Sequence, residues 1–385
     1  MGGKLEFPRI CIIGVGLIGG SIASAAKRLD PRQYIVGIDM DVASLEFALE
    51  HNLIDEGATP ADSVVNSWLG ADSASGLACD LVLLATPASS AEEWFQVLGA
   101  SGFEGVITDV ASTKRKVLEA AQRHLKDPGA FVGGHPMAGS EVSGVTAARP
   151  DLFKGAYYVL TPTRETNAEA FRKLHAFVGS LGARVLSVDA NEHDSAVAII
   201  SHVPHVTASA LVDLAKIHAG EGDELLRLAA GGFKDTTRIA AGSPDLWTGI
   251  CLDNADAIAA GVDELIAVLS DFAGKVRARD GEALRAWLAH AADVRRALPA
   301  QWVPATERLT EVIIPMVDKP GVISEVTAAV GRAGCNIEAI EIDHISEDTA
   351  LLVLALTDEG DFDRLFRELV SCGYDPLFRP IEPLE

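Results

Sequence analysis

Cysteine is scarce in this chain, and no two cysteines stand at the spacing of a metal or redox motif. The cysteines are odd in number, scattered over 385 residues and without a CxxC pair: Cys11, Cys79, Cys251, Cys335 and Cys372. This usage argues against a disulfide framework and indicates reduced thiols in a cytoplasmic protein. Long hydrophobic runs are also missing, since stretches such as CDLVLLA have the length of a strand rather than of a membrane span. The opening residues MGGKLEFPRI carry no signal-peptide pattern.

Positive charge is the second scarcity. Lys and Arg number 32 against 55 Asp and Glu, which gives a formal net charge of -23. A surface of this sign repels nucleic acid and anionic membranes, so we expect neither as a partner. An anionic small molecule is not excluded, because a local cluster of cations and backbone amides suffices to bind it. Hydrophobic residues make up 48% of the chain, ample for the cores of about two or three domains.

The first half of the chain alternates short apolar strands with amphipathic helical stretches. The expected strands are RICIIGVG, YIVGID, DLVLLATP, GVITDVAS, AFVGGHP, AYYVLTP and RVLSVD. This alternation predicts the α/β class, with a doubly wound, mainly parallel Rossmann-like sheet in residues 1–189.

Two further domains follow. Residues 190–298 have few strand signals and many Ala-rich helical stretches, and we expect an all-helical domain that forms a dimer interface. Residues 299–308, with two prolines, read as a linker. Residues 309–385 show the order βαββαβ of a ferredoxin-like domain.

A glycine-rich turn between the first strand and the first helix predicts a dinucleotide site. The sequence GVGLIG supplies the GxGxxG pattern, in which glycines permit a tight turn and a close approach to pyrophosphate. Asp39 ends the second strand, where a carboxylate binds ribose hydroxyls and repels a 2′-phosphate, so NAD is favoured over NADP. The candidate cofactor-binding residues are Gly14, Gly16, Leu17, Ile18, Gly19, Asp39, Thr86 and Pro87.

The stretch GHPMAGSE places a histidine at the end of an apolar strand. Pro136 favours an extended backbone at His135 and so fixes the direction of the imidazole. A dehydrogenase acting on an alcohol needs a base, and histidine titrates near neutrality. A histidine that only caps a strand edge explains this stretch equally well. Ser112, at the end of a neighbouring strand, is either the N-cap of the next helix or a hydrogen-bond partner of substrate or His135.

The helical region holds a second group of candidates. His202 and His205 share one helical face, and Pro204 between them should kink the helix. The spacing does not match the i, i+4 histidines of helical zinc sites, and no cysteine cluster completes a ligand set, so no metal is expected. Arg238 is either a bidentate carboxylate ligand or a surface helix charge.

Taken together, these motifs resemble one family. GVGLIGGS, DVASTK, GGHPMAGSE, NEHDSAVAIISHVPH and GGFKDTTRIA occur in the order and spacing of prephenate dehydrogenases, over residues 9–298. DKPGVISEV followed by AGCNIEAIEI resembles an ACT domain, a module that binds amino acids and regulates an attached enzyme. The resemblance implies an NAD-dependent oxidative decarboxylation of prephenate to 4-hydroxyphenylpyruvate, a step of tyrosine biosynthesis. It also implies that the enzyme is a homodimer and that an amino acid inhibits it by feedback.

The resemblance also implies roles for residues. His135 would be the catalytic base, held by Ser112. The implied substrate-binding residues are His205, Arg238, Asp235 and Trp247. The implied regulatory residues are Asp318, Gly321, Val322, Asn336 and Ile337.

Three alternatives stay open at this point. Arogenate, which has an amino group in place of the keto group of prephenate, would give tyrosine directly. A β-hydroxyacid or phosphogluconate type of dehydrogenase shares the layout but needs a catalytic lysine on a helix. A non-catalytic amino-acid sensor that binds NAD would be expected to lose some of Ser112, His135, His205 and Arg238, all of which are present.

Overall fold

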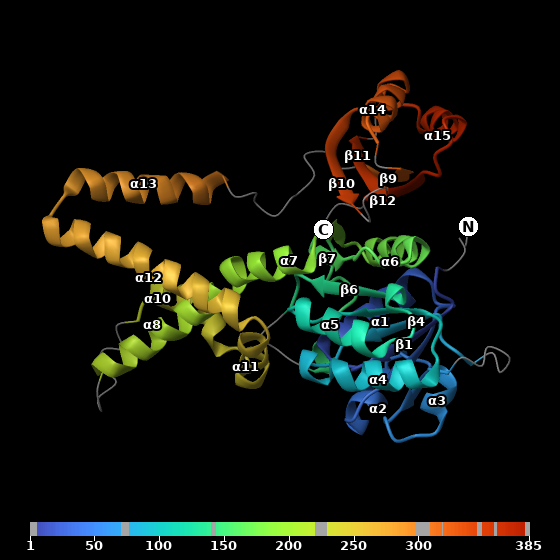
Figure 1. Ribbon diagram of the computed structural model, residues 1–385, viewed down its shortest axis with the longest axis horizontal. Coiled ribbons are helices and arrows are strands. Elements are labelled where there is room, and N and C mark those ends of the chain that lie inside the picture. Colours follow the sequence, from blue (N-terminus) through green and yellow to red (C-terminus); the bar gives the residue numbers. More distant parts are fainter. Residues whose placement is uncertain are drawn as a thin grey trace. The chain divides into compact units, whose positions relative to one another are not determined.

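The computed structural model describes residues 6–70, 77–139, 144–219, 229–297, 309–317, 319–344, 349–357 and 360–381. The chain forms two compact units (Figure 1). The first combines Met1–Ala190 with Val303–Glu385, and the second is Asn191–Trp302.

An eight-stranded sheet forms the larger part of the first unit, with the order β3-β2-β1-β4-β5-β6-β7-β8. The neighbours are parallel except for β6 and β7, which are antiparallel. The strands are β1 Arg9–Ile13, β2 Tyr34–Ile38, β3 Glu56–Ala58, β4 Leu81–Leu84, β5 Val106–Asp109, β6 Phe131–Pro136, β7 Tyr157–Thr161 and β8 Arg184–Ser187. The expected mainly parallel sheet is confirmed. The edge strand β3 was not predicted, because its sequence EGA carries no apolar alternation.

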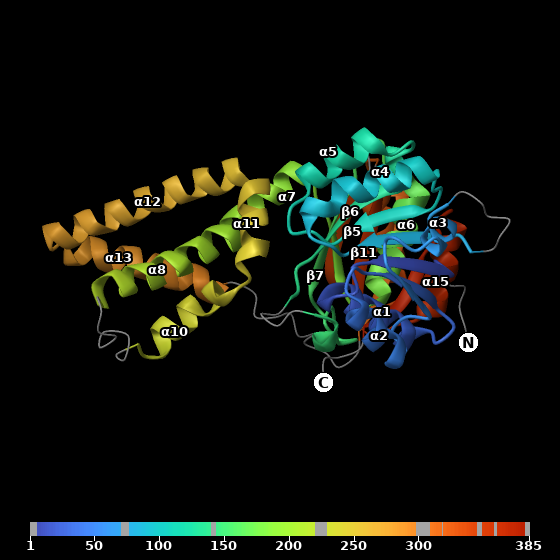
Figure 2. The same cartoon turned by 90° about the horizontal axis from the view of Figure 1, so that it is seen from below.

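Helices cover both faces of this sheet (Figure 2). They are α1 Leu17–Leu29, α2 Val42–Glu50, α3 Val64–Trp68, α4 Ala91–Ser101, α5 Arg115–His124 and α6 Ala168–Ser180, with 3-10 turns η2 Ala88–Ser90, η3 Pro128–Ala130 and η4 Val145–Ala147. Ile22 of α1 and Phe171 of α6 belong to one buried cluster, and Phe95 of α4 and Val117 of α5 to another on the opposite face. Helices on both faces explain why the strands are continuous apolar runs.

The connections out of β1 and β4 define the ligand edge of the sheet. β1 continues into α1 on one face, and β4 into α4 on the other, although the two strands are neighbours. In open α/β sheets such a switch point leaves a crevice at the carboxyl ends of the strands, where ligands bind.

The second unit is helical. Its elements are α7 Ala190–Val197, the π-helical turn η5 Ala198–His202, α8 Val203–Ala219, α10 Gly231–Thr237, the 3-10 turn η6 Arg238–Ala241, α11 Pro244–Asp253, α12 Ala255–Ala278 and α13 Gly281–Ala297. Pro204 lies just after η5, whose wider turn takes the N–H of Val203 back to the carbonyl of Ala198. A π-helical turn therefore lies just before Pro204, where the sequence predicts a kink.

The segment Ala190–Ala219 is long and apolar enough to cross a membrane by length and composition, with 33% of its apolar window buried. A core or interface helix passes the same test, and this segment carries the buried polar residues His193, Asp194 and His202. Buried, partnered polar groups fit a packed helical domain.

The C-terminal part of the first unit is a four-stranded antiparallel sheet of order β10-β11-β9-β12 with two helices. The elements are β9 Leu309–Val317, α14 Val322–Arg332, β10 Ile337–His344, β11 Thr349–Thr357, α15 Phe362–Ser371 and β12 Leu377–Ile381. The βαββαβ order and this strand order confirm the ferredoxin-like fold. The expected linker 299–308 lies outside the described residues.

Candidate active site

The glycine loop after β1 leaves no room for side chains except where a ligand would approach. Gly14 has φ +98°, and a Cβ there would lie 2.6 Å from the carbonyl oxygen of Ala85. A Cβ on Gly19 would lie 2.2 Å from the carbonyl oxygen of Gly14, so the third glycine lets α1 pack against the turn. A Cβ on Gly16 would meet nothing within 4 Å. That open side of the loop fits the approach of a pyrophosphate.

The first turn of α1 is available to an anion. Gly16 is the N-cap and supplies no side-chain hydrogen bond to the amides of the first turn, which begins at Leu17 and Ile18. Unfilled amides and the helix dipole together favour a phosphate at this position.

Asp39, which follows β2, fixes the glycine loop. Its carboxylate accepts hydrogen bonds from the N–H of Val15 at 2.7 Å and from the N–H of Asp41 at 2.9 Å. The sequence did not reveal this tie between the ends of β1 and β2. Each oxygen keeps a further lone pair for a ribose hydroxyl. Of the two candidates after β4, Thr86 lies beside the loop, since a Cβ on Gly14 would be 2.9 Å from its backbone nitrogen, and its hydroxyl accepts a hydrogen bond from Ser90 at 2.8 Å. Pro87 is exposed. These residues fit NAD.

His135 lies near the end of β6, at the same edge of the sheet. It pairs with Val159 of antiparallel β7, and its side chain is almost buried, with 9% exposed. The N–H of Met137 donates to the carbonyl of Tyr157 at 2.8 Å and continues the ladder past Pro136. The backbone is therefore held on both sides of the histidine.

A buried ion pair forms hydrogen bonds with the backbone of the residue before His135. Lys114 and Asp109 form a salt bridge with 1% and 2% of their side chains exposed. The ammonium of Lys114 donates to the carbonyl oxygen of Gly134 at 2.6 Å, and Asp109 accepts the N–H of Gly134 at 2.9 Å. A Cβ on Gly134 would lie 2.6 Å from the carbonyl oxygen of Asp109, so only glycine allows this approach. Both charged residues belong to the motif DVASTK, but the sequence alone did not predict that they pair.

Ser112 lies at the same edge, after β5, and is half-buried. The N-cap of α5 is Lys114, and Ser112 precedes it by two residues. The expected N-cap role of Ser112 is therefore wrong. Lys114 at this position forms the buried ion pair with Asp109.

In the helical unit, His205 and Trp247 form a stacked pair. Their ring centroids are 3.5 Å apart and their planes differ by 13°. The Nδ1 atom of His205 is buried, and no atom of the described residues forms a hydrogen bond with it. Burial lowers the pKa of His205. A neutral imidazole with an unfilled ring nitrogen, backed by an indole, is suited to a polar group of a ligand.

His202 and His193 belong to a buried network next to this pair. The amide of Asn254 donates to the carbonyl of Asp194 at 2.7 Å and lies 3.4 Å from Nδ1 of His202. Nδ1 of His193 lies 2.8 Å from the carboxylate of Asp194. Burial lowers the pKa of His202 to about 4, although the charge of Asp194 opposes this shift. Asn254 is the N-cap of α12, so its contacts with Asp194 and His202 join α7 and η5 to the start of α12.

The remaining predicted substrate residues are less enclosed. Arg238 begins η6, which packs against α8, and Asp235 lies one turn earlier in α10. Both side chains are exposed, whereas Trp247 is half-buried. Among the residues that the structure describes, no group of three or more His, Cys, Asp or Glu side chains is arranged to hold a metal ion.

The predicted regulatory residues lie around the first turn of α14 and the start of β10. Gly321 has φ +99° and is the N-cap of α14, while the side chain of Val322 is buried. The carbonyl of Asn336 accepts the N–H of Thr357 at 3.1 Å, and Ile337 opens β10. Asp318 lies outside the described residues.

A dinucleotide loop and a strand-end histidine at one edge of a doubly wound sheet are the arrangement of a nicotinamide-dependent dehydrogenase, the class that this fold defines. Three family models match the chain: the prephenate dehydrogenase nucleotide-binding domain over residues 22–187, the prephenate dehydrogenase dimerization domain over 189–290, and the ACT domain over 310–373. The chain belongs to the prephenate dehydrogenase family and is an NAD-dependent oxidoreductase.

Individual proteins of this family are also similar to the chain. The prephenate dehydrogenase of Bacillus subtilis (strain 168) is 37% identical, over 92% of this chain and 93% of its own. The crystal structure of prephenate dehydrogenase from Aquifex aeolicus with hydroxyphenyl propionate and NAD+ has a TM-score of 0.70 and 29% identity, and covers 77% of this chain and 100% of its own. Synechocystis arogenate dehydrogenase is also similar, at a TM-score of 0.62 and 30% identity over 75% of this chain and 99% of its own.

Proposed function

We propose that this protein oxidises prephenate with NAD, releasing carbon dioxide and 4-hydroxyphenylpyruvate for tyrosine biosynthesis. The observation that carries the proposal is the position of His135 at the sheet edge that also holds the glycine loop and Asp39. Relatives named prephenate dehydrogenase, aligned over nearly the whole chain, support prephenate rather than arogenate as the substrate.

In this reaction the alcohol carbon of the substrate ring loses a hydride, and bound NAD supplies the nicotinamide that accepts it. His135 takes the proton of the hydroxyl group as a general base. Ser112 positions that imidazole or the hydroxyl. The ring carboxylate then leaves as carbon dioxide, and its bonding electrons complete the aromatic ring. The Asp109–Lys114 pair keeps His135 in place by binding both backbone groups of Gly134.

The helical unit would bind the two carboxylates and the ring of prephenate. Arg238 is the residue that we assign to a carboxylate, because a guanidinium binds it in bidentate fashion. His205 offers its ring nitrogen to a polar group, with Trp247 stacked behind it. Asp235, one turn before Arg238, would orient the guanidinium.

The first test is reduction of nicotinamide by the purified protein, with prephenate and arogenate each offered with NAD and with NADP. Turnover of prephenate with NAD supports the proposal. A preference for arogenate would move the substrate but keep the mechanism. Failure of all four combinations would favour an amino-acid sensor and overturn the enzymatic function.

We further propose that the C-terminal domain binds an aromatic amino acid and that the enzyme is inhibited by it. The site would be built from Asp318, Gly321, Val322, Asn336 and Ile337. Tyrosine is the first ligand to test, since it is the product of the pathway. Asn336→Ala removes an exposed side chain and leaves the backbone carbonyl that binds Thr357. Inhibition unchanged in this variant would place the effector elsewhere, including the active site.

We propose a cytoplasmic homodimer assembled through the helical domain, with the domain boundaries given above. Several large apolar side chains of this domain are exposed in the single chain: Ile200, Val212, Leu214 and Ile217 before α10, and Ile266, Leu269 and Val276 in α12. Apolar area of this kind marks an interface. Light scattering on the purified protein gives the mass, and a monomer at micromolar concentration would exclude the dimer.

A further inference from the structure

Beside His135, an aromatic ring and a guanidinium lie at the same edge of the large sheet. Strand β7 runs antiparallel to β6, and β8 runs parallel to β7, so both begin at the edge where β6 ends. Their first residues are Tyr157 and Arg184, which are register partners. The N–H of Met137, two residues after His135, donates to the carbonyl of Tyr157 at 2.8 Å. Neither side chain is among the groups that bind cofactor or substrate in the proposed reaction.

The side chain of Tyr157 points to the same face of the sheet as that of His135. Tyr158 belongs to the buried cluster on the face that α1 and α6 cover. Side chains of successive residues in a strand alternate between the faces, so Tyr157 points to the opposite face. A Cβ on Gly134 would lie 3.0 Å from the ring of Tyr158, so Gly134 faces the cluster and His135 faces away from it.

The ring of Tyr157 holds the guanidinium of Arg184 on this face. The guanidinium carbon lies 4.7 Å from the ring centroid, and Tyr157 is 38% exposed. Val185, the next residue of β8, belongs to the cluster on the other face, which agrees with this direction for Arg184. An aromatic face orients a guanidinium without neutralising it. The stack itself therefore leaves a positive charge in place at the ligand edge.

The separation of His135 and Arg184 fits the length of the substrate. The two residues are two strands and two register positions apart. With strands about 4.8 Å apart and a rise of about 3.4 Å per residue, their backbones are about 12 Å apart. In prephenate the hydroxyl group and the ring carboxylate stand at opposite ends of the six-membered ring, and a hydrogen bond at each end adds about 2.8 Å. A substrate whose hydroxyl faces His135 can therefore reach Arg184 with its ring carboxylate.

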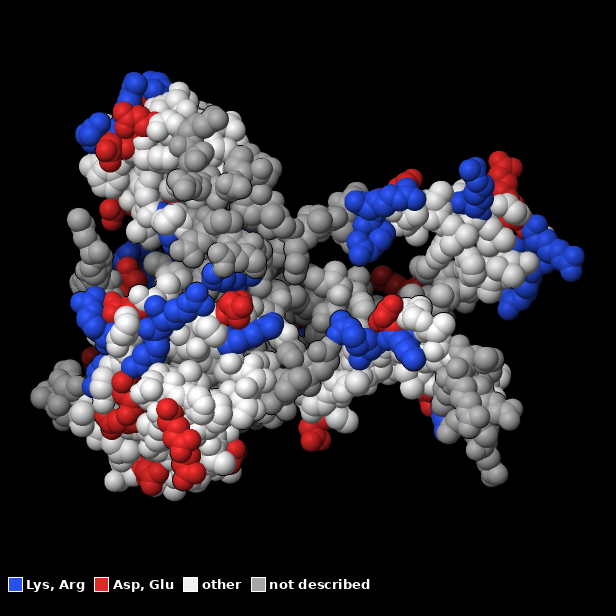
Figure 3. Space-filling view, turned by 180° about the vertical axis from the view of Figure 1, so that it is seen from behind, with Lys and Arg blue, Asp and Glu red and all other residues white. Residues whose placement is uncertain are grey.

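The charge of the substrate requires a second cation. Prephenate has two carboxylates, and Arg238 is assigned to one of them. On the face of the molecule in Figure 3, Lys and Arg side chains lie among Asp and Glu rather than in one basic patch. The ammonium of Lys114, near the same edge, is buried against Asp109 and cannot meet the substrate. Arg184 supplies the second charge.

We propose that Arg184, held by Tyr157, binds the ring carboxylate of prephenate, while Arg238 binds the carboxylate of the side chain. The ring carboxylate is fixed opposite the hydroxyl, so it is the group that a cation at a set distance from His135 selects. The contact fixes the ring relative to His135 until the carboxylate leaves as carbon dioxide. This inference rests on the proposed function, because it takes prephenate as the substrate.

Arg184→Gln tests the contact with two ligands that differ in the ring carboxylate. Prephenate has this group, and the product 4-hydroxyphenylpyruvate has lost it. We expect KM for prephenate to rise about tenfold or more, while product inhibition by 4-hydroxyphenylpyruvate and KM for NAD stay within about twofold. Arg238→Gln should weaken the binding of both ligands. If Arg184→Gln leaves KM for prephenate unchanged, or weakens both ligands equally, the proposal is overturned.

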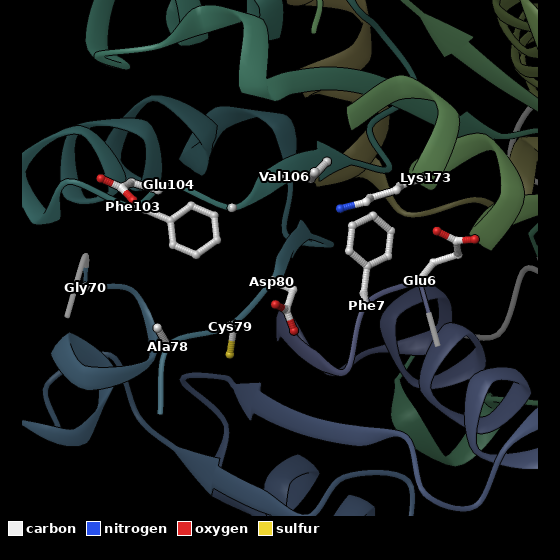
Figure 4. Close-up of a pocket in the computed structure, with 11 residues that line it drawn as sticks. Glu6, Phe7, Gly70, Ala78, Cys79, Asp80, Phe103, Glu104, Val106 and Lys173 are labelled. Atoms are coloured by element: carbon white, nitrogen blue, oxygen red, sulfur yellow. The ribbon is translucent and has the colours of Figure 1, made fainter. Parts of the chain in front are cut away.

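Tyr157 and a second stacked arginine provide the controls. Tyr157→Phe keeps the ring and should keep KM for prephenate, whereas Tyr157→Ala should raise it. Arg9 begins β1 at the opposite edge of the sheet, and its N–H donates at 2.8 Å to Asp80, which lines the pocket in Figure 4. Its guanidinium stacks on Tyr34 at 4.3 Å, so Arg9→Gln removes a similar stack and should leave KM unchanged. An equal rise of KM in Arg9→Gln and Arg184→Gln would assign the effect to lost packing and refute the contact.

Failure of this proposal and failure of the proposed function give different results. If the unchanged protein does not turn over prephenate, the function itself is refuted. Turnover by the unchanged protein together with an unaltered KM in Arg184→Gln refutes the role of Arg184 alone. If Arg184→Gln does not fold, Arg184→Lys decides, because it keeps the charge but loses the two parallel N–H groups that match a carboxylate. We expect KM for prephenate to rise in the Lys variant with KM for NAD unchanged, and an unaltered KM for prephenate there would overturn the proposal.

Discussion

The ammonium of Lys114 lies 2.6 Å from the carbonyl oxygen of Gly134, the residue that immediately precedes His135. Lys114 is also paired with Asp109, and both side chains are almost fully buried. The buried ammonium needs the carboxylate of Asp109 to balance its charge. It also supplies the hydrogen bond that the buried carbonyl oxygen of Gly134 needs. The position of the histidine backbone is thus tied to a charge pair contributed by the neighbouring strand end.

Replacing Lys114 by Met should destabilise the protein strongly. The change leaves the Asp109 carboxylate buried without its cation, which costs about 3–5 kcal/mol of unfolding free energy. Urea unfolding followed by circular dichroism measures the loss. Lys116→Met, exposed two residues later, is the matched control and should change the free energy by no more than about 0.5 kcal/mol. Equal stabilities of the two variants would contradict the account of the pair.

His135→Asn should abolish turnover without weakening the binding of NAD. The amide keeps a polar side chain of similar size but cannot take a proton, so we expect kcat to fall by about two orders of magnitude or more. Steady-state kinetics and a fluorescence titration with NAD measure the two effects separately. Near-normal turnover would remove His135 from the role of base.

Asp39→Ala should raise the dissociation constant of NAD by about tenfold, equivalent to about 1.4 kcal/mol. The variant loses both the ribose contact that we propose and the hydrogen bond that fixes Val15. Asp41→Ala is the control. The side chain of Asp41 caps α2, and only its backbone N–H, which the variant keeps, donates a hydrogen bond to Asp39. We expect the control to lower stability by about 1 kcal/mol and to keep the NAD affinity. Similar losses of affinity in both variants would argue against the assignment.

Trp247→Ala should weaken the binding of prephenate more than that of NAD. The variant lacks the indole ring that stacks on His205. We expect KM for prephenate to rise about tenfold, which corresponds to a loss of about 1.4 kcal/mol of binding free energy. The matched control is Trp287→Ala, which removes an indole that packs on Phe272 in the same unit. A KM that rises equally in both variants would indicate a general loss of packing.

Acid should weaken the helical domain through His202. Its pKa is about 4 in the folded protein against an ordinary value of 6.5, so the unfolded chain binds the proton more readily. The stability that comes from keeping this histidine neutral is complete above pH 6.5 and is lost as the pH falls toward 4. Urea unfolding at a series of pH values should show this decline, and His202→Gln should flatten it. A wild-type slope in the variant would assign the decline to other groups.

Much of the fold followed from local patterns. The strands around Ile12 and Leu83 are apolar runs bounded by turn residues, and the glycine loop stands between a strand and a helix. The sequence predicted a kink at Pro204 but not the π-helical turn before it, because the sequence shows the missing N–H but not how the helix adapts. The edge strand β3 was missed because its three residues pair through backbone groups alone.

The sequence by itself determined which elements form and which chemical groups stand at their ends, since strand and helix periods and glycine turns are local properties. It placed His135 and Asp39 at strand ends, and parallel strands bring such ends to one edge. Only the tertiary structure decided which groups meet, such as Lys114 with Gly134, Trp247 with His205, and Asn254 with Asp194. These contacts join residues far apart or in different elements, and they depend on how strands and helices pack, which no local pattern encodes.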